Sequence, residues 1–327
     1  MKILMVGVLR PGSNGLSLAD GFRDAGAKVT EVDLSDLSYP RRGTRSWAEL
    51  KWLRRHGSRA AMEFSLRLRR QSLDRFDLLV AVKCVNFPQE PLLEFNADKR
   101  VHVSFDDLGN PENVSDAYLR HEPYWDAIVT TKSYNVPEIR SRGGVPIFIN
   151  NAYDPRLHFS DLPLSARRFD IGFIGARRRD RADLVRVMHT HFAEKAIIYG
   201  PGWRSERSSL VEVRPATGAA GFVKAAESFK ASLVLLNSDN RDLQTARTFE
   251  AAAAGNLVLA KDTPEHREIY SVNEAVFFNT PSDLADLTAR MDQDPTWAQR
   301  VATAGHDRVV GGNNAYFHRA MQIISEI

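Results

Sequence analysis

Residues 2–26 read KILMVGVLRPGSNGLSLADGFRDAG and decide the fold of the first part of the chain. The apolar run 2–9 predicts a buried strand, the turn residues 11–15 predict a loop, and residues 16–25 predict a helix that Gly26 ends. A strand, a glycine-containing loop and a helix in this order are typical of the start of a doubly wound α/β sheet. Gly12 and Gly15 do not complete the GxGxxG pattern, so bound NAD is poorly supported. The two glycines still allow the loop backbone to approach a phosphate or an acceptor closely.

The same alternation of strand and helix continues along the chain. The predicted strands are short and apolar, as expected for parallel strands covered on both faces. Between residues 150 and 169 the pattern becomes irregular, which predicts a hinge. We therefore expect an α/β protein with Rossmann-like domains at residues 1–160 and 161–312, followed by an amphipathic helix at 313–327. The predicted strands are 2–9, 28–33, 78–82, 100–105 and 127–131, then 170–174, 195–199, 210–213, 232–237, 257–260 and 275–278. The predicted helices of the second domain include 182–192, 222–229, 265–270, 281–291 and one that ends near Ala304 and Gly305.

Residues 247–270, RTFEAAAAGNLVLAKDTPEHREIY, carry the strongest indication of a binding site. Glu250 is expected at the start of an alanine-rich helix that ends at Gly255. A carboxylate there accepts hydrogen bonds from two neighbouring hydroxyls, as on a ribose, while the helix N-terminus favours a diphosphate. Asp242, eight positions earlier on a loop, can serve a sugar in the same way. The alternative is an ordinary helix with an acidic first turn and a glycine stop.

Composition narrows the class of protein. The chain has 327 residues, 43% of them hydrophobic and 26% charged, which is ordinary for a soluble globular protein and favours two domains of about 150 residues each. No apolar run reaches the roughly 18 residues of a membrane-spanning helix, and the first residues are interpreted as a strand rather than a signal peptide. A single cysteine, Cys84, excludes an internal disulfide framework and a cysteine zinc cluster and fits the cytoplasm.

Positive charge is concentrated in residues 41–75. This segment has eleven Lys or Arg residues against three acids, although the net charge of the whole chain is only +3. Interleaved apolar residues favour basic amphipathic helices that meet an anionic membrane surface or acceptor. A solvated face with an ordinary buried stripe is the alternative. Nucleic acid is not expected, because no known binding motif accompanies the charge.

The carboxyl-terminal half resembles a known family. The run GFVKAAESFKASLVLLNSDNRDLQTARTFEAAAAGNLVLAKDTPEHREIY, residues 221–270, is similar to the glycosyl transferase group 1 domain of CgeB-like proteins of the spore maturation type. Further similarity lies in DIGFIGARRRDRADL, IIYGPGW, VSFDD, TTKSYNVPEIRSRGG and NNAYDPRLH. The resemblance implies the GT-B fold, in which two Rossmann-like doubly wound domains face a cleft and the last helix crosses back to the first domain.

The resemblance also implies roles for two acids. In the related retaining group, two acids stand eight positions apart, and the first contacts the donor sugar while the second contacts the ribose. Glu250 matches the second position. Asp242 occupies the first position in place of glutamate, and its side chain is shorter.

The other expected donor-site residues follow from charge and reach. A departing nucleoside diphosphate gains negative charge, so cationic groups and helix amides beside it stabilise the transition state. Arg247 could instead pair with an acid of its own domain. Trp203 is expected either to border the base or to be an exposed aromatic residue of a turn. The residues expected to bind the donor are Gly12, Gly15, Arg177, Arg181, Gly200, Trp203, Arg247, Thr248, Phe249 and Glu250, the last two through their amides.

Asp106 and Asp107 follow a predicted strand of the first domain. A carboxylate there can orient an acceptor hydroxyl or take its proton, so both are expected as catalytic residues beside Asp242 and Glu250. The alternative is a turn or helix cap.

These expectations combine into a cytoplasmic glycosyltransferase. It would move a sugar from a nucleotide diphosphate donor to a hydroxyl of a glycan, a lipid-linked carrier or a protein, with retention of configuration and without a metal ion or other cofactor. A nucleotide-sugar epimerase or hydrolase on the same scaffold is one alternative. A catalytically idle nucleotide-sugar-binding partner protein is another.

Overall fold

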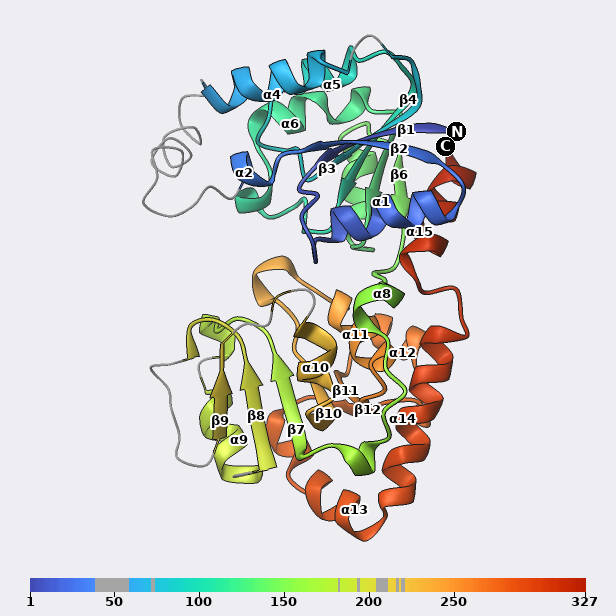
Figure 1. Ribbon diagram of the computed structural model, residues 1–327. Helices are drawn as coiled ribbons and strands as arrows, with labels where there is room; N and C mark the ends of the chain where they lie inside the picture. The colour runs from blue at the N-terminus through green and yellow to red at the C-terminus, as the bar shows by residue number, and fades with distance from the viewer. Residues whose placement is uncertain are drawn as a thin grey trace. The chain divides into compact units, whose positions relative to one another are not determined.

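The computed structural model describes residues 1–38, 59–71, 74–181, 183–192, 195–203, 211–215, 218 and 221–327. These residues form two compact α/β units (Figure 1). Unit 1 comprises Met1–Asn150 and Tyr316–Ile327, and unit 2 comprises Asn151–Ala315. The division therefore falls at the beginning of the segment 150–169, where the sequence predicts the hinge.

Unit 1 is built on a six-stranded parallel sheet with the order β2-β1-β3-β4-β5-β6. Its strands are β1 (Lys2–Gly7), β2 (Lys28–Asp33), β3 (Phe76–Val82), β4 (Ala97–Ser104), β5 (Ala127–Thr130) and β6 (Pro146–Phe148). Its helices are α1 (Asn14–Asp24), α2 (Ser35–Ser38), α4 (Arg59–Arg69), α5 (Glu90–Leu93), α6 (Asp116–His121), α7 (Asn135–Ser141) and α15 (Tyr316–Glu326). The order reverses between β1 and β3, where open α/β sheets bind ligands.

The ends of α1 show how the sequence sets this geometry. Ser13 caps the helix by accepting a hydrogen bond from the Leu16 amide, so α1 begins at Asn14 rather than at the predicted residue 16. Figure 1 shows α15 beside α1, and a side chain at Gly21 of α1 would clash with the Tyr316 carbonyl. The last helix therefore packs on the first helix within unit 1.

Unit 2 is also built on a six-stranded parallel sheet, with the order β12-β11-β10-β7-β8-β9. Its strands are β7 (Phe169–Ile174), β8 (Ala196–Tyr199), β9 (Val211–Arg214), β10 (Phe229–Val234), β11 (Leu257–Lys261) and β12 (Val276–Phe278). Its helices are α8 (Pro155–His158), α9 (Leu184–Phe192), α10 (Phe222–Ala226), α11 (Ala246–Ala253), α12 (Pro264–Ile269), α13 (Leu287–Gln293) and α14 (Pro295–Val310). Counted from β7, this is the 3-2-1-4-5-6 order of dinucleotide-binding sheets, with its switch point between β7 and β10. The predicted α/β fold class with two doubly wound domains is confirmed.

Three predicted helices of unit 2 were wrong in extent. The helix predicted at 222–229 ends at Ala226, and Phe229 already belongs to β10. The segment 281–291 is divided into a short 3-10 helix, η9 (Pro281–Leu284), and α13. The helix expected to end near Ala304 and Gly305 runs on to Val310. Gly305 does not stop it, because this glycine lets α14 pass so close to the Glu274 carbonyl that a side chain would clash there.

Most of the basic segment 41–75 lies outside the described residues. Within α4, Phe64 and Leu68 are buried in the core of unit 1, and Arg67 forms ion pairs with Asp36 and Glu63. This described part is therefore a solvated helix with a buried stripe. None of the described helices combines the length and apolar character that crossing a membrane requires.

Candidate functional site

The carboxyl ends of β7 and β10 bring several of the predicted site residues to one edge of the unit 2 sheet. The loop after β7 carries Arg177, Arg178 and Arg181. The segment after β10 carries the 3-10 helix η8 (Ser238–Asn240), then Asp242, and then α11 with Arg247 and Glu250. Because β7 and β10 pair directly at the switch point, these two segments adjoin.

Glu250 is buried in a small cluster of charged and aromatic side chains. Its Oε2 lies 2.7 Å from Arg247 Nη1, and its Oε1 lies 3.5 Å from His158 Nε2. The Arg247 guanidinium stacks over the Phe222 ring at 4.4 Å, and the His158 ring meets the same ring edge-to-face at 4.9 Å. Arg247 thus pairs with an acid of its own domain, which was the alternative interpretation of this residue.

His158 presents a proton to Glu250. The Asp154 amide donates to His158 Nδ1 at 2.9 Å, so the ring proton of the neutral imidazole is on Nε2, which faces Glu250. Burial lowers the pKa of His158 and thereby favours the neutral ring, although the Glu250 charge acts in the opposite direction. The carboxylate is therefore held between a guanidinium and an N–H group.

The expected place of Glu250 at the start of α11 was wrong. The helix begins at Ala246 after the N-cap Thr245, so Glu250 lies more than one turn inside it. The amides of Phe249 and Glu250 are thus within the helix, and the first amides belong to Ala246 and Arg247. Phe249 contributes a fully buried ring to the core instead.

A hydrogen-bond chain fixes the first turn of α11. The Thr245 amide donates to the Thr248 hydroxyl at 3.2 Å, and this hydroxyl lies 2.9 Å from His266 Nε2. His266 Nδ1 lies 2.6 Å from the Lys261 carbonyl, which only accepts, so Nε2 accepts the Thr248 proton. Tyr270 donates its hydroxyl proton to the Thr248 carbonyl at 2.7 Å. Thr248 is therefore a buried support of the helix start.

The arginines after β7 differ in their roles. Arg178 pairs with Asp239 at 2.7 Å and donates to Asn237 at 2.9 Å, which ties the two loops together. Arg181 donates to the carbonyls of Ala176, Leu235 and Leu236 and is largely a support of the sheet edge. Burial lowers its pKa, and its charge interacts with Asp242 and Arg247.

Two buried arginine nitrogens at this edge have no hydrogen-bond partner among the described residues. They are Arg181 Nε and Arg247 Nη1, whose contact with Glu250 is an ion pair without hydrogen-bond geometry. Buried donors without an acceptor are costly, and such groups are frequently found at ligand sites. The edge can therefore accept an anion with hydrogen-bond acceptors.

Trp203 does not border a binding surface, which corrects both interpretations of this residue. Its ring is fully buried, packs against Phe173, and donates its Nε1 proton to the Gly175 carbonyl at 2.8 Å. Gly200 lies beside the same carbonyl, where any side chain would clash. The Arg177 amide donates to Pro201 at 3.0 Å, so these residues join the loops after β7 and β8.

In unit 1, Asp106 and Asp107 have different surroundings. Asp107 is almost fully buried and accepts the Gly109 amide at 2.8 Å and the Asn135 side chain at 3.3 Å, so it caps a turn, and its expected catalytic role stays a prediction. Asp106 is partly exposed and pairs with Lys83 at 2.6 Å. Lys83 follows β3 with a left-handed φ of 55°, at the switch point of this sheet.

The structure explains why residues 12 and 15 are both glycines without reference to a ligand. Gly12 turns the loop after β1 with a φ of 79°, which favours glycine. Gly15 lies in the first turn of α1, where a side chain would meet the Val8 carbonyl at 2.5 Å. Their predicted role in binding stays a prediction.

The sequence reasoning missed His158 and Phe222 as parts of the Glu250 cluster. Both lie in segments that carry the family resemblance, NNAYDPRLH and GFVKAAES, but their chemistry alone gave no reason to pair them with Glu250. Among the described residues, no group of three or more His, Cys, Asp or Glu side chains is arranged to hold a metal ion, and metal independence stays a prediction.

Comparison with known proteins adds a family match for part of the chain. Residues 177–325, a little under half of the sequence, match the model of a family described as glycosyl transferase-like. This match covers the edge of unit 2 that carries Arg177 to Glu250. No curated protein matches the sequence.

Solved structures with a similar fold cover the whole chain. Sucrose-phosphate synthase from Thermosynechococcus elongatus has 14% identity and a TM-score of 0.71, covering 100% of this chain and 98% of that one. HepE of Anabaena in complex with UDP and glucose has 15% identity and a TM-score of 0.64, covering 100% and 98%. The β-glucosyltransferase of phage T4 has 14% identity and a TM-score of 0.59, covering 100% of both chains. The predicted GT-B fold is therefore confirmed.

Proposed function

We propose that this protein is a glycosyltransferase that takes a sugar from a nucleotide diphosphate donor held by unit 2. The observation that carries the proposal is the convergence, at one switch point, of a helix N-terminus, a buried carboxylate, and two buried arginine nitrogens that donate no hydrogen bond to any described residue. The family match over residues 177–325 supports the same reaction class. The similar fold of HepE, which was solved in complex with UDP and glucose, supports the donor class.

In this proposal the diphosphate binds at the first turn of α11. The amides of Ala246 and Arg247 and the positive end of the helix dipole attract its charge. Arg247 Nη1 and Arg181 Nε supply the hydrogen-bond donors that lack acceptors within the described part of the chain. These groups also stabilise the charge that develops on the departing diphosphate.

In this proposal the Glu250 carboxylate binds the ribose. Two adjacent hydroxyls donate to its carboxylate, and the first of them displaces the weak 3.5 Å contact of His158. Asp242 contacts the sugar of the donor. Asp106, which is the accessible member of its acid pair, acts on the acceptor hydroxyl of a glycan, a lipid-linked carrier or a protein. Retention of configuration rests on the family resemblance. Independence of a metal ion rests on the helix dipole and the arginines, which can balance the charge of the diphosphate.

A donor panel tests this function. The full chain is incubated with UDP-, GDP-, dTDP- and ADP-sugars, with and without a pool of glycan and lipid acceptors, and free nucleotide and transferred sugar are both measured. We expect saturable consumption of one nucleotide class that depends on the acceptor. Equal consumption without acceptor would favour a hydrolase or epimerase, and binding without turnover would favour an idle binding protein. No binding of any nucleotide would contradict the proposal.

A further inference from the structure

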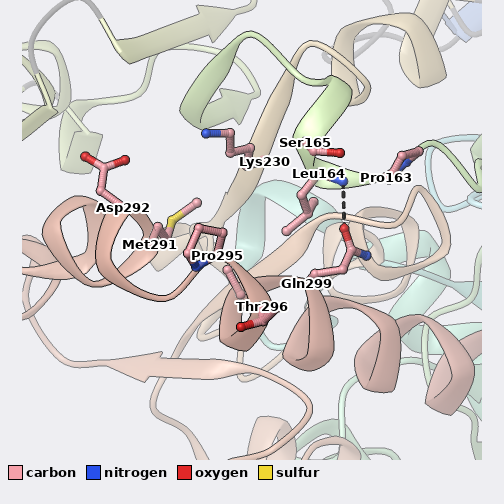
Figure 2. A pocket seen from close by; sticks show the side chains of 10 residues that line it. Pro163, Leu164, Ser165, Lys230, Met291, Asp292, Pro295, Thr296 and Gln299 are labelled. Carbon is pink, nitrogen blue, oxygen red and sulfur yellow. Dashed lines mark hydrogen bonds between the residues drawn. The ribbon is translucent and has the colours of Figure 1, made fainter.

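A cavity of about 410 Å³ opens near the amino end of β10 in the unit 2 sheet, opposite the end that carries the proposed donor site (Figure 2). Three elements line it: the 3-10 helix η3 (Leu164–Ala166), the beginning of β10, and the turn from α13 to α14. Its walls are mainly apolar, and its lining residues include Leu164, Met291, Pro295 and Ala298. Pockets of this size and character hold small molecules in many proteins.

This cavity is separate from the proposed donor site. Lys230, which lines it, is the second residue of β10, whereas η8 and α11 follow the opposite end of that strand. The sheet therefore lies between the two sites. Nothing in the proposed reaction uses the cavity.

Four alternating charges surround one end of the cavity. Lys230 Nζ lies 2.7 Å from Asp170 Oδ1, Lys195 Nζ lies 3.2 Å from Asp170 Oδ2, and Lys195 Nζ lies 2.9 Å from Asp292 Oδ2. The two ends of this chain of ion pairs, Lys230 and Asp292, line the cavity. Figure 2 shows them on one side of the view, with Met291 and Pro295 between them and Gln299.

The two charged residues of the lining, Lys230 and Asp292, have opposite signs, so the cavity suits a ligand that carries one charge of each sign. A net charge brought against this mainly apolar wall would have no balancing partner. Lys230 has three ammonium protons and, within the described part of the chain, one acceptor in Asp170, which leaves protons for a ligand carboxylate. Asp292 has a further oxygen for a ligand ammonium group.

Two neutral polar side chains of the lining, those of Gln299 and Thr296, are already engaged. Gln299 Oε1 accepts the Leu164 amide at 2.9 Å, and Gln299 Nε2 donates to Thr303 at 3.1 Å. The Thr296 hydroxyl donates to Asp294 at 2.6 Å. Lys230 and Asp292 are the charged residues of the lining, so recognition of a charged head depends on them.

We propose that this cavity is a binding site for a small zwitterion with an apolar body, the class to which apolar α-amino acids belong. The ligand carboxylate contacts Lys230, its ammonium group contacts Asp292, and its apolar body packs on Leu164, Met291 and Pro295. The site is independent of the nucleotide-sugar site.

Titration of the full chain with L-leucine, L-methionine and L-phenylalanine tests this site, and hexanoate and hexylamine serve as probes with one charge. We expect saturable binding of at least one amino acid with one site per chain, and at least tenfold weaker binding of both single-charge probes. Lys230→Met should weaken amino-acid binding at least tenfold. Lys28→Met, the same change at an exposed lysine of unit 1, should leave it unchanged.

A second variant keeps the proposal testable if Lys230→Met does not fold. Ser165 is exposed and lines the cavity, so Ser165→Trp should fill it and abolish binding without a loss of thermal stability. Binding that survives Ser165→Trp and Lys230→Met would overturn the proposal. The proposal would also be overturned if none of the three amino acids bound, or if hexanoate bound as tightly as the amino acids. Saturating nucleotide should not compete, and competition would also overturn the site.

Discussion

Glu250 is the residue on which the proposed donor site depends most. Without donor its carboxylate already has two partners, Arg247 at 2.7 Å and His158 at 3.5 Å. Both belong to unit 2, so the carboxylate is held in place before any ligand arrives. A preorganised acceptor loses less side-chain entropy when the ribose binds.

Glu250→Gln should weaken nucleoside diphosphate binding by about 1.5–3 kcal/mol, or about 10- to 150-fold, because a charged acceptor of two hydroxyl protons becomes neutral. Calorimetric titration measures this change. Glu268→Gln is the matched control, since Glu268 is an exposed acid of the same unit. Equal affinities of the two variants would remove Glu250 from the ribose site.

His102 gives a prediction for stability in acid. It is fully buried between Tyr118 and Trp125, neither ring nitrogen has a hydrogen-bond partner among the described residues, and burial lowers its pKa to about 3. The unfolded chain binds this proton near pH 6.5, the ordinary value, so stability falls as the pH drops below that value. The loss from this group should be about 2 kcal/mol between pH 7.5 and 5.

His102→Leu should therefore flatten the dependence of unit 1 unfolding on pH over this interval. Denaturant unfolding at both pH values, compared with the unchanged chain, measures the difference. Buried His158 and His266, whose pKa values are also lowered by burial, remain in both proteins and cancel in the comparison. Equal slopes would show that His102 is accessible to protons in the folded protein.

For single residues, the sequence indicated the chemistry of a side chain better than its burial and its contacts in the fold. Glu250 and Arg247 lie at the predicted sheet edge because a helix after a parallel strand must begin there. Trp203 was misassigned, since burial depends on contacts between distant loops that spacing does not reveal. His158 was missed for the same reason, because α8 and α11 are far apart in the chain.

The elements around the donor site depend on close backbone approach. Gly200, after β8, has no room for a side chain beside the Gly175 carbonyl, which also accepts the Trp203 proton. This contact sets the distance between the loops after β7 and β8. The loop that carries Arg177 and Arg178 is therefore positioned from two sides, by Gly200 and by Asp239.

Gly200→Ala should destabilise unit 2 by about 1–3 kcal/mol and weaken nucleotide binding, because the loops must separate. Gly218→Ala is the control, since no atom of the described residues lies within 4 Å of the added methyl group. Thermal unfolding and nucleotide titration of both variants measure the effects. An unchanged melting temperature for Gly200→Ala would show that the loops tolerate the displacement.

The order of the elements was largely predictable, and their ends were less so. Apolar runs marked eleven strands, but β6 was missed because its three residues are bounded by Gly144 and include Pro146. The start of α11 was placed too late, because the N-cap Thr245 precedes Ala246, a residue that does not mark a helix start. Gly305 was interpreted as a stop, whereas its small size serves the packing of α14 against Glu274.

At the scale of the whole molecule, unit 1 combines residues from two distant parts of the chain, Met1–Asn150 and Tyr316–Ile327. The Arg319 side chain donates to the Asn150 carbonyl at 2.9 Å, and Gln322 donates to Phe148 at 3.1 Å, so α15 also fixes the segment after β6. Burial lowers the pKa of Arg319 to about 10. Ile323 and Tyr316 are buried against unit 1.

Removal of residues 316–327 should lower the stability of unit 1 by about 3–6 kcal/mol, because two large apolar side chains lose their burial. Nucleotide affinity should stay within about threefold, since the residues proposed to contact the diphosphate and the ribose all belong to unit 2. Hydrogen exchange resolved by peptide, together with nucleotide titration, measures both. Unchanged exchange in α1 and β1, or loss of nucleotide binding, would contradict this division of roles.

A crystal structure of the full chain with its bound nucleoside diphosphate tests the central claim most directly. We predict the diphosphate at the amides of Ala246 and Arg247, with the ribose hydroxyls donating to Glu250. A nucleotide bound elsewhere, or a Glu250 carboxylate that keeps both Arg247 and His158 while the ribose points away, would contradict the account.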